Sequence, residues 1–209
     1  MPGGTDPGLQ ILDPLPIDIA RPMVLLRLGY RRASQVPEKT SRLIDEVMAE
    51  AGRLLRPKAV YREVGIEVED GATVVTIGGA VRSGSRSLCE RLAPCRVAVV
   101  FAATIGALLE DWTHSLMSDG RMTRGLLADA CGSAAATALG LKLEEVITAR
   151  FKERGLEATR RYAPGYGDWN LADQTPLFSL LDSGRIGLTL TEDHLMIPAK
   201  SISGIIGGK

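Results

Sequence analysis

The chain has 209 residues, of which 45% are hydrophobic and 24% are charged, and its 25 Lys and Arg residues balance its 25 Asp and Glu residues. A net charge of zero argues against a nucleic-acid-binding protein and against a polybasic membrane-surface protein. The longest nearly unbroken apolar segment, residues 97–109, is shorter than the roughly 20 residues that span a bilayer, so we expect no membrane-spanning segment.

Residues 1–16 contain four prolines and three glycines. So many breakers predict a flexible N-terminal tail without regular structure, which docks through Leu9, Ile11 and Leu12. The tail has no basic segment followed by an apolar one, so we expect no secretory signal and a cytoplasmic location. The length is that of a single domain, which we place at residues 17–209.

Apolar periodicity predicts alternating helices and strands up to about residue 154. Asp70-Gly71 lies between two segments rich in Val and Ile and is a strong turn signal for a β-hairpin. The glycine-rich segment 78–87 lacks the Gly-Lys-Ser/Thr of a phosphate-binding loop, and we interpret it as a helix start with serine caps. The predicted elements are a helix over 22–28 that ends at Gly29, a helix over 40–55 capped by Thr40 or Ser41, strands over 59–69 and 72–77, a helix that reaches Leu92, a buried strand over 97–103, and helices over 105–117 and 121–154.

A dense group of polar and aromatic residues follows, in the sequence RYAPGYGDW at 161–169. Arg161 can hold a carboxylate through two parallel hydrogen bonds. Glycines such as Gly165 let the backbone approach a ligand closely, and Tyr166 or Trp169 can stack on a ring. The alternative is a surface turn with a structural arginine and buried aromatic side chains.

A second polar group begins at Thr191 and Glu192. These residues end a predicted strand over 186–190, a position where sites often form. The alternative is a polar turn between two strands. A short helix over 171–181 and a strand over 201–206 complete the predicted elements.

The sequence contains no visible catalytic or metal-binding constellation. His114 and His194 lie far apart, with no further ligand at metal-binding spacing. Cys89, Cys95 and Cys131 are an odd, low number typical of a reduced cytosolic chain, and they fit no common zinc motif. We expect them to be small residues in or near the core.

Five motifs occur in order between residues 160 and 206, namely R-x-x-x-G-Y-G-D-W, Q-x-x-L-F-x-L-L, I-G-x-x-L-T-E, M-x-P and S-x-S-G. This order resembles the S-adenosylmethionine-binding activation domain of cobalamin-dependent methionine synthase, and more closely the free-standing version of that domain. A weaker likeness extends upstream through residues 28–30 and 129–138. The resemblance and the hairpin signal together imply an α+β fold in which a bent, mostly antiparallel sheet is packed with long helices.

The resemblance implies an accessory role in methionine biosynthesis. The domain would present S-adenosylmethionine to inactive cob(II)alamin carried by a methionine synthase that lacks this domain. An electron from flavodoxin or a similar reductase, together with methyl transfer, would restore methylcobalamin. The domain would position the ligand rather than supply catalytic groups, and proximity alone can lower a barrier by roughly 7–11 kcal/mol.

The family motif also assigns residues to the ligand. Arg161 matches the arginine that holds the methionyl carboxylate, and Gly165 and Tyr166 match the pair beside the ligand. Asp168 falls where backbone contacts to the adenosine moiety are expected. Thr191 and Glu192 match a Thr-Glu pair near the site.

The sequence departs from the family pattern in the long helix, where Thr137 replaces an acidic residue that would favour the cationic groups of the ligand. Asp129, Glu144 or Glu145 could compensate. Neither an N-terminal acidic contact nor the family's later C-terminal contacts have a counterpart here. These departures favour an alternative, a docking or reactivation module for another corrinoid methyltransferase with a weak or vestigial site. A third possibility is a soluble α+β domain without a ligand.

Overall fold

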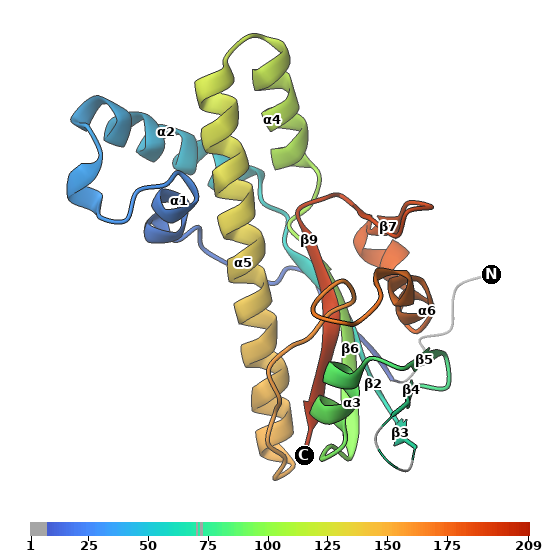
Figure 1. Ribbon diagram of the computed structural model, residues 1–209. Coiled ribbons are helices and arrows are strands. Elements are labelled where there is room, and N and C mark those ends of the chain that lie inside the picture. Colours follow the sequence, from blue (N-terminus) through green and yellow to red (C-terminus); the bar gives the residue numbers. More distant parts are fainter. Residues whose placement is uncertain (1–7, 70, 72) are drawn as a thin grey trace.

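The computed structural model describes residues 8–69, 71 and 73–209 (Figure 1). Its antiparallel strands and packed helices confirm the predicted α+β class. Short 3-10 turns occur at Ala33–Gln35, Leu171–Asp173 and Ser183–Ile186. The helices and strands are β1 Leu9–Leu12, α1 Arg21–Arg27, α2 Glu38–Leu54, β2 Lys58–Val64, β3 Ile66–Val68, β4 Val75–Ile77, β5 Val81–Ser83, α3 Arg86–Leu92, β6 Val97–Thr104, α4 Leu108–Ser118, α5 Met122–Glu153, α6 Gln174–Ser179, β7 Thr189–Leu190, β8 Met196–Ile197 and β9 Ser201–Gly208.

Four antiparallel strands form the central sheet, in the order β1-β2-β6-β9. Side chains alternate between its two faces, as the pleat of a strand requires. Tyr61 and Phe101 pack in the core under the long helices, whereas Val60 and Val100 pack in a second core on the opposite face. Because both faces are covered, the central strand β6 is an almost unbroken apolar run.

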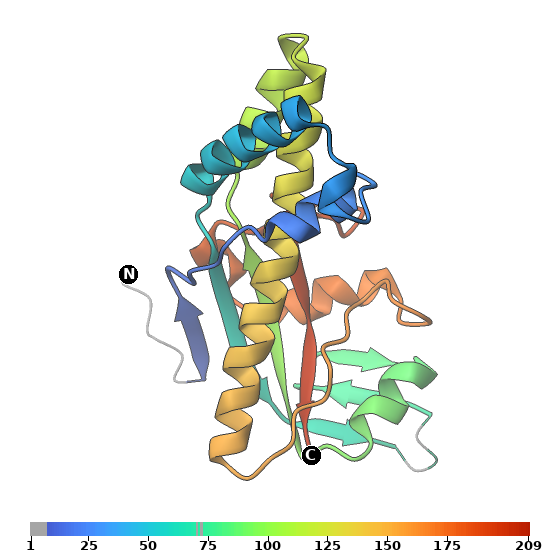
Figure 2. The same ribbon diagram turned by 90° about the vertical axis from the view of Figure 1, so that its left-hand side faces the viewer.

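One face of the sheet is covered by α5, which is 32 residues long and pairs with α4 (Figure 2). By length and composition α5 could cross a membrane, but 56% of its apolar segment is buried inside the protein. Leu139, Leu143 and Ile147 of this helix lie in the core beneath it. The apolar composition of α5 is therefore used for packing on the sheet.

The opposite face is covered by α3, α6 and a small sheet of β3, β4 and β5 (Figures 1 and 2). The strand predicted over 59–69 is divided at Gly65, so that β2 joins the central sheet and β3 joins the small one. β3 and β4 form the predicted hairpin, with Ile66 opposite Ile77. Asp70 of its predicted turn lies outside the described residues.

The prediction of a tail without regular structure is wrong for residues 9–12, which form β1. This strand pairs with β2, with Leu9 opposite Arg62 and Leu12 opposite Ala59. Its apolar side chains are partly buried against both cores, in agreement with the expected docking. The prolines flank these four residues in the sequence, so they do not interrupt the pairing. Residues 1–7 of the predicted tail lie outside the described part of the chain.

Two further predictions need correction. The helix predicted to start at Thr40 or Ser41 begins at Glu38, and Pro37 occupies the cap position without a side-chain hydrogen bond. The strand predicted over 186–190 is reduced to Thr189–Leu190. Gly187, with φ of 71°, ends the preceding 3-10 turn in a left-handed conformation that an extended strand does not allow.

After α5 the chain returns along β9 before it forms the loop at 161–169. Isolated bridges join Ala158 to Gly208 and Tyr162 to Ile205. In the second bridge each backbone N–H donates to the opposite carbonyl, at 2.9 and 2.8 Å. Gly204, with φ of 151°, permits this approach, because a Cβ there would collide with the backbone oxygen of Tyr162. The bridge covers the edge of the sheet and holds the loop in place.

Asp168 fastens the far end of the loop to the start of α3. Its carboxylate accepts hydrogen bonds from Ser85 Oγ and from the backbone N–H of Arg86, both at 2.7 Å. Ser85 is also the N-cap of α3, since its Oγ accepts from the N–H of Leu88, and this confirms the predicted serine cap. These hydrogen bonds, the one from Ser85 first, lower the pKa of Asp168 to about 2.

We expect Gly204→Ala to lower the free energy of unfolding by roughly 2 kcal/mol or more, because backbone strain and overpacking each cost about 1–3 kcal/mol. Urea unfolding measures the change. Gly184→Ala is the matched control, since a Cβ there meets no atom within 4 Å. Equal stability of the Gly204→Ala variant and the wild type would show that the close approach to Tyr162 is not required.

We expect Asp168→Asn to lower the unfolding temperature at pH 7. A carboxylate whose pKa is held at about 2 in the folded state, below its ordinary 3.8, stabilises the protein above about pH 4. That contribution is lost as the pH falls through 2, so wild type and variant should converge there. Asp193→Asn, which removes another exposed carboxylate, controls for net charge. A difference that persists unchanged at pH 2 would contradict this account.

Candidate functional site

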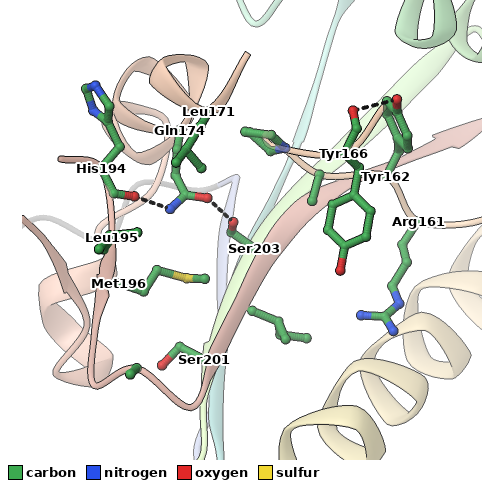
Figure 3. A pocket seen from close by; sticks show the side chains of 14 residues that line it. Arg161, Tyr162, Tyr166, Leu171, Gln174, His194, Leu195, Met196, Ser201 and Ser203 are labelled. Carbon is green, nitrogen blue, oxygen red and sulfur yellow. Dashed lines mark hydrogen bonds between the residues drawn. The ribbon is translucent and has the colours of Figure 1, made fainter. Parts of the chain in front are cut away.

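A cavity of about 490 Å³ opens over the first residues of β9 (Figure 3). One wall is the loop that carries Arg161 and Tyr166, and the opposite wall contains Gln174 of α6 and the segment from His194 to Met196. The floor is formed by residues 201–203 of β9. The bridge to β9 and the hydrogen bonds of Asp168 to α3 hold the first of these walls in place.

Buried hydrogen bonds join the floor to the wall opposite Arg161. Gln174 is only 3% exposed, and its Nε2 donates to the carbonyl oxygen of His194 at 2.7 Å. Its Oε1 accepts from Ser203 Oγ at 2.8 Å. The ring nitrogen Nδ1 of His194 is also within 2.7 Å of Thr175 Oγ1. These contacts hold His194 at a φ of 63°, a conformation that few residues other than glycine adopt.

Arg161 reaches the cavity from the end of the segment that pairs with β9. Its Nε lies 3.5 Å from Glu144 Oε2 of α5, and its backbone N–H donates to Oε1 of the same carboxylate at 3.4 Å. The Arg161 side chain is 34% exposed. A guanidinium in this position can still meet a carboxylate inside the cavity.

The two aromatic residues that could stack on a ligand have different environments. Trp169 is 2% exposed, stacks on Tyr162 with ring centres 5.7 Å apart, and donates from Nε1 to Asp173 at 2.8 Å. The Tyr162 hydroxyl in turn donates to the backbone oxygen of Tyr166 at 2.8 Å. Tyr166 itself is 67% exposed and lines the cavity. Trp169 therefore belongs to the loop's own packing, and of these two residues Tyr166 is the one whose side chain is available to a ligand.

The structure brings together only some of the residues assigned from the family motif. Arg161 and Tyr166 line the cavity, and Gly165, with φ of 86°, forms the turn between them. The side chain of Asp168 is directed to α3 rather than to the cavity. Thr191 and Glu192 line a separate open groove on the other side of His194.

The residues considered as substitutes for the missing acidic group also occupy different places. Thr137 does not line the cavity, and its hydroxyl accepts a hydrogen bond from Arg27 at 3.3 Å. Asp129 pairs with Lys200 at 2.8 Å, and Glu145 pairs with Lys142 at 2.9 Å. Glu144 is the member of this set that contacts Arg161.

Gln174, His194 and Ser203 are site residues to which the sequence motifs assigned no role, although Gln174 and Ser203 belong to two of those motifs. The glutamine that opens the Q-x-x-L-F-x-L-L motif is the signal that could have drawn attention to Gln174. Its partners are 20 and 29 residues away in the chain, so only the fold identifies them.

The site has no metal-binding or thiol chemistry of its own. Among residues 8–69, 71 and 73–209, no group of three or more His, Cys, Asp or Glu side chains could hold a metal ion. Cys89 and Cys131 are buried, and burial raises the pKa of the Cys131 thiol to about 11. The expectation that the cysteines lie in or near the core is confirmed.

A solved structure described as the MetH reactivation domain bound to AdoHcy shares this fold. It superposes with a TM-score of 0.68 at 16% sequence identity, over 96% of this chain and 78% of that one. A search of curated proteins gave no match.

The family model described as "Vitamin B12 dependent methionine synthase, activation domain" matches residues 100–209, just over half of the chain. The matched region begins in β6 and contains α5, β9 and every residue that lines the cavity. The chain therefore belongs to the activation-domain family of vitamin B12-dependent methionine synthase.

Proposed function

We propose that the protein binds S-adenosylmethionine in the cavity over β9 and presents it, in the cytoplasm, for reductive remethylation of cob(II)alamin on a cobalamin-dependent methionine synthase that lacks this domain. The observation that carries the proposal is that Arg161 and Tyr166 of the family motif meet at one cavity. Its volume of about 490 Å³ lies within the roughly 300–1,000 Å³ typical of small-molecule sites. The similar reactivation domain has AdoHcy bound, which is the demethylated product of this ligand.

In this proposal the two ends of the ligand are held by different groups. The guanidinium of Arg161 receives the methionyl carboxylate, because it can offer two parallel N–H donors. The exposed ring of Tyr166 packs against the adenosine end, and Gly165 lets the backbone turn beside it. The backbone at Asp168 contributes to the adenosine contacts, while its carboxylate fixes the loop. Thr191 and Glu192 reach only a part of the ligand that extends past His194.

The chain's contribution to the reaction is positioning. The partner's cobalamin, reduced by one electron from a flavodoxin-like or other reductase, accepts the methyl group and leaves S-adenosylhomocysteine. The residues that line the cavity offer no acid–base pair for this transfer, and none is needed. Holding the sulfonium methyl at a fixed distance and direction converts a bimolecular encounter into an intramolecular one.

A second candidate is a docking or reactivation module for another corrinoid methyltransferase, with a weak ligand site. One observation favours it: none of the side chains that line the cavity, all from the described part of the chain, is acidic. A sulfonium and an ammonium group would then face no carboxylate among these lining side chains, and Glu144 lies behind Arg161. The two candidate functions differ in the corrinoid protein that is reactivated, so a test with each partner distinguishes them.

We expect Arg161→Ala to weaken binding of S-adenosylmethionine about 10- to 100-fold, because hydrogen bonds to charged groups contribute roughly 1.5–3 kcal/mol. Isothermal titration of the purified protein measures the affinity, with S-adenosylhomocysteine as a second ligand. The exposed neighbour Arg160 provides the matched control, Arg160→Ala. Unchanged affinity in Arg161→Ala, with the fold intact, would refute the carboxylate contact.

We expect the protein to restore methylcobalamin on a methionine synthase whose own activation domain has been removed. With S-adenosylmethionine and reduced flavodoxin present, conversion of the cob(II)alamin spectrum should be at least about tenfold faster than without the protein. The Arg161→Ala variant is the control for the ligand site. Conversion with a different corrinoid methyltransferase but not with methionine synthase would replace the first candidate by the second.

A further inference from the structure

The face of α5 toward α4 and the cavity walls carries three glycines, and each lies opposite a side chain from another element. An added Cβ would lie 2.6 Å from Met117 Cγ at Gly125, 3.4 Å from Lys200 Cε at Gly132 and 2.5 Å from Arg161 Nη1 at Gly140. The glycines are separated by seven and eight residues, which keeps them on one side of a helix. Two of the three receive a cationic side chain, namely Lys200 from the segment before β9 and Arg161 from the loop after α5.

Gly140 is in the closest contact with a residue of the proposed site. An added Cβ would be 2.5 Å from Nη1, 2.9 Å from Cζ and 3.2 Å from Nη2 of Arg161. Three atoms of the planar guanidinium therefore lie near the position that a side chain would occupy. Glu144, one turn further along α5, lies 3.5 Å from the Nε of the same group. The guanidinium thus occupies the space over Gly140, which has no side chain, and it also lies beside the Glu144 carboxylate of the same helix.

We propose that Gly140 is a positioning residue that sets the direction in which Arg161 presents its guanidinium to the ligand. With Nε facing Glu144, the two terminal nitrogens form the pair of donors that a ligand carboxylate can meet. A methyl group at Gly140 pushes the Arg161 guanidinium away from the helix, so that its two terminal nitrogens no longer align with the ligand carboxylate. This inference rests on the proposed function, since it concerns the same ligand.

The packing explains why a glycine stands in the interior of a long helix, where it is less favourable than alanine. The atoms that a Cβ would displace are the far end of a flexible side chain and not backbone. The fold can therefore accept alanine at Gly140 by moving Arg161. The substitution should change ligand recognition without lowering stability.

The test is isothermal titration of Gly140→Ala with S-adenosylhomocysteine and with 5′-methylthioadenosine, which keeps the adenosine and thioether but lacks the amino-acid end. We expect the affinity for S-adenosylhomocysteine to fall about tenfold or more, the size of a lost charge-assisted hydrogen bond, with the affinity for 5′-methylthioadenosine unchanged. Adding Gly140→Ala to Arg161→Ala should cause no further loss.

Two glycine substitutions in helices serve as controls. Gly132→Ala places its Cβ at an ordinary 3.4 Å from Lys200, and Gly52→Ala meets no atom within 4 Å. Both should leave the two affinities unchanged, and Gly52→Ala gives the unfolding temperature expected from helix propensity alone. Equal losses for both ligands in Gly140→Ala, or unchanged affinity for S-adenosylhomocysteine, would overturn the inference.

A crystal structure of Gly140→Ala separates this inference from the proposed function. If the wild type binds neither ligand, the proposed function fails, but the position of Arg161 in the variant still decides the role of Gly140. A guanidinium displaced from α5 supports the inference. A guanidinium that keeps its place beside Glu144 overturns it.

Discussion

The backbone bridge between Tyr162 and Ile205 is the contact on which the rest of the site depends. It anchors the loop at 161–169 to the edge strand of the central sheet, where an uncovered strand would otherwise expose its hydrogen-bonding groups. The bridge requires Gly204, because no side chain fits between that position and the backbone of Tyr162. Arg161 precedes the bridged residue, so its position follows from the pairing of the backbone.

The long helix α5 serves both the core and the site. Its apolar residues pack on the sheet, while its glycines leave room for side chains of α4, of the segment before β9 and of the loop after the helix. Lys200 pairs with Asp129 and donates to Ser133 Oγ, and it lies beside Gly132. One rigid element therefore contacts both the loop that carries Arg161 and the segment that leads into the cavity floor.

The properties of the cavity agree with the proposed function. Ser203 of its floor donates to Gln174 of one wall, and both side chains are buried, so a hydrogen bond between neutral groups holds the floor and this wall together. Its exposed aromatic side chain, Tyr166, remains available, whereas Trp169 stabilises the loop. The proposed methyl transfer requires accurate placement more than acid–base groups, and the family to which the chain belongs is the activation domain of vitamin B12-dependent methionine synthase.

Local periodicity in the sequence was sufficient to predict α1, α2, α5 and β6 to within a few residues, because the helical and strand repeats are properties of neighbouring residues. The ordered motifs between residues 160 and 206 likewise identified the family that the comparison shows. Tertiary structure alone decided which strand β1 pairs with, where the segment over 59–69 changes sheets, and that the Asp168 carboxylate binds α3. It also decided that Tyr166 and not Trp169 faces the cavity. Each of these outcomes depends on a contact with residues far away in the chain. The helical and strand repeats of neighbouring residues do not specify which distant residues make such a contact.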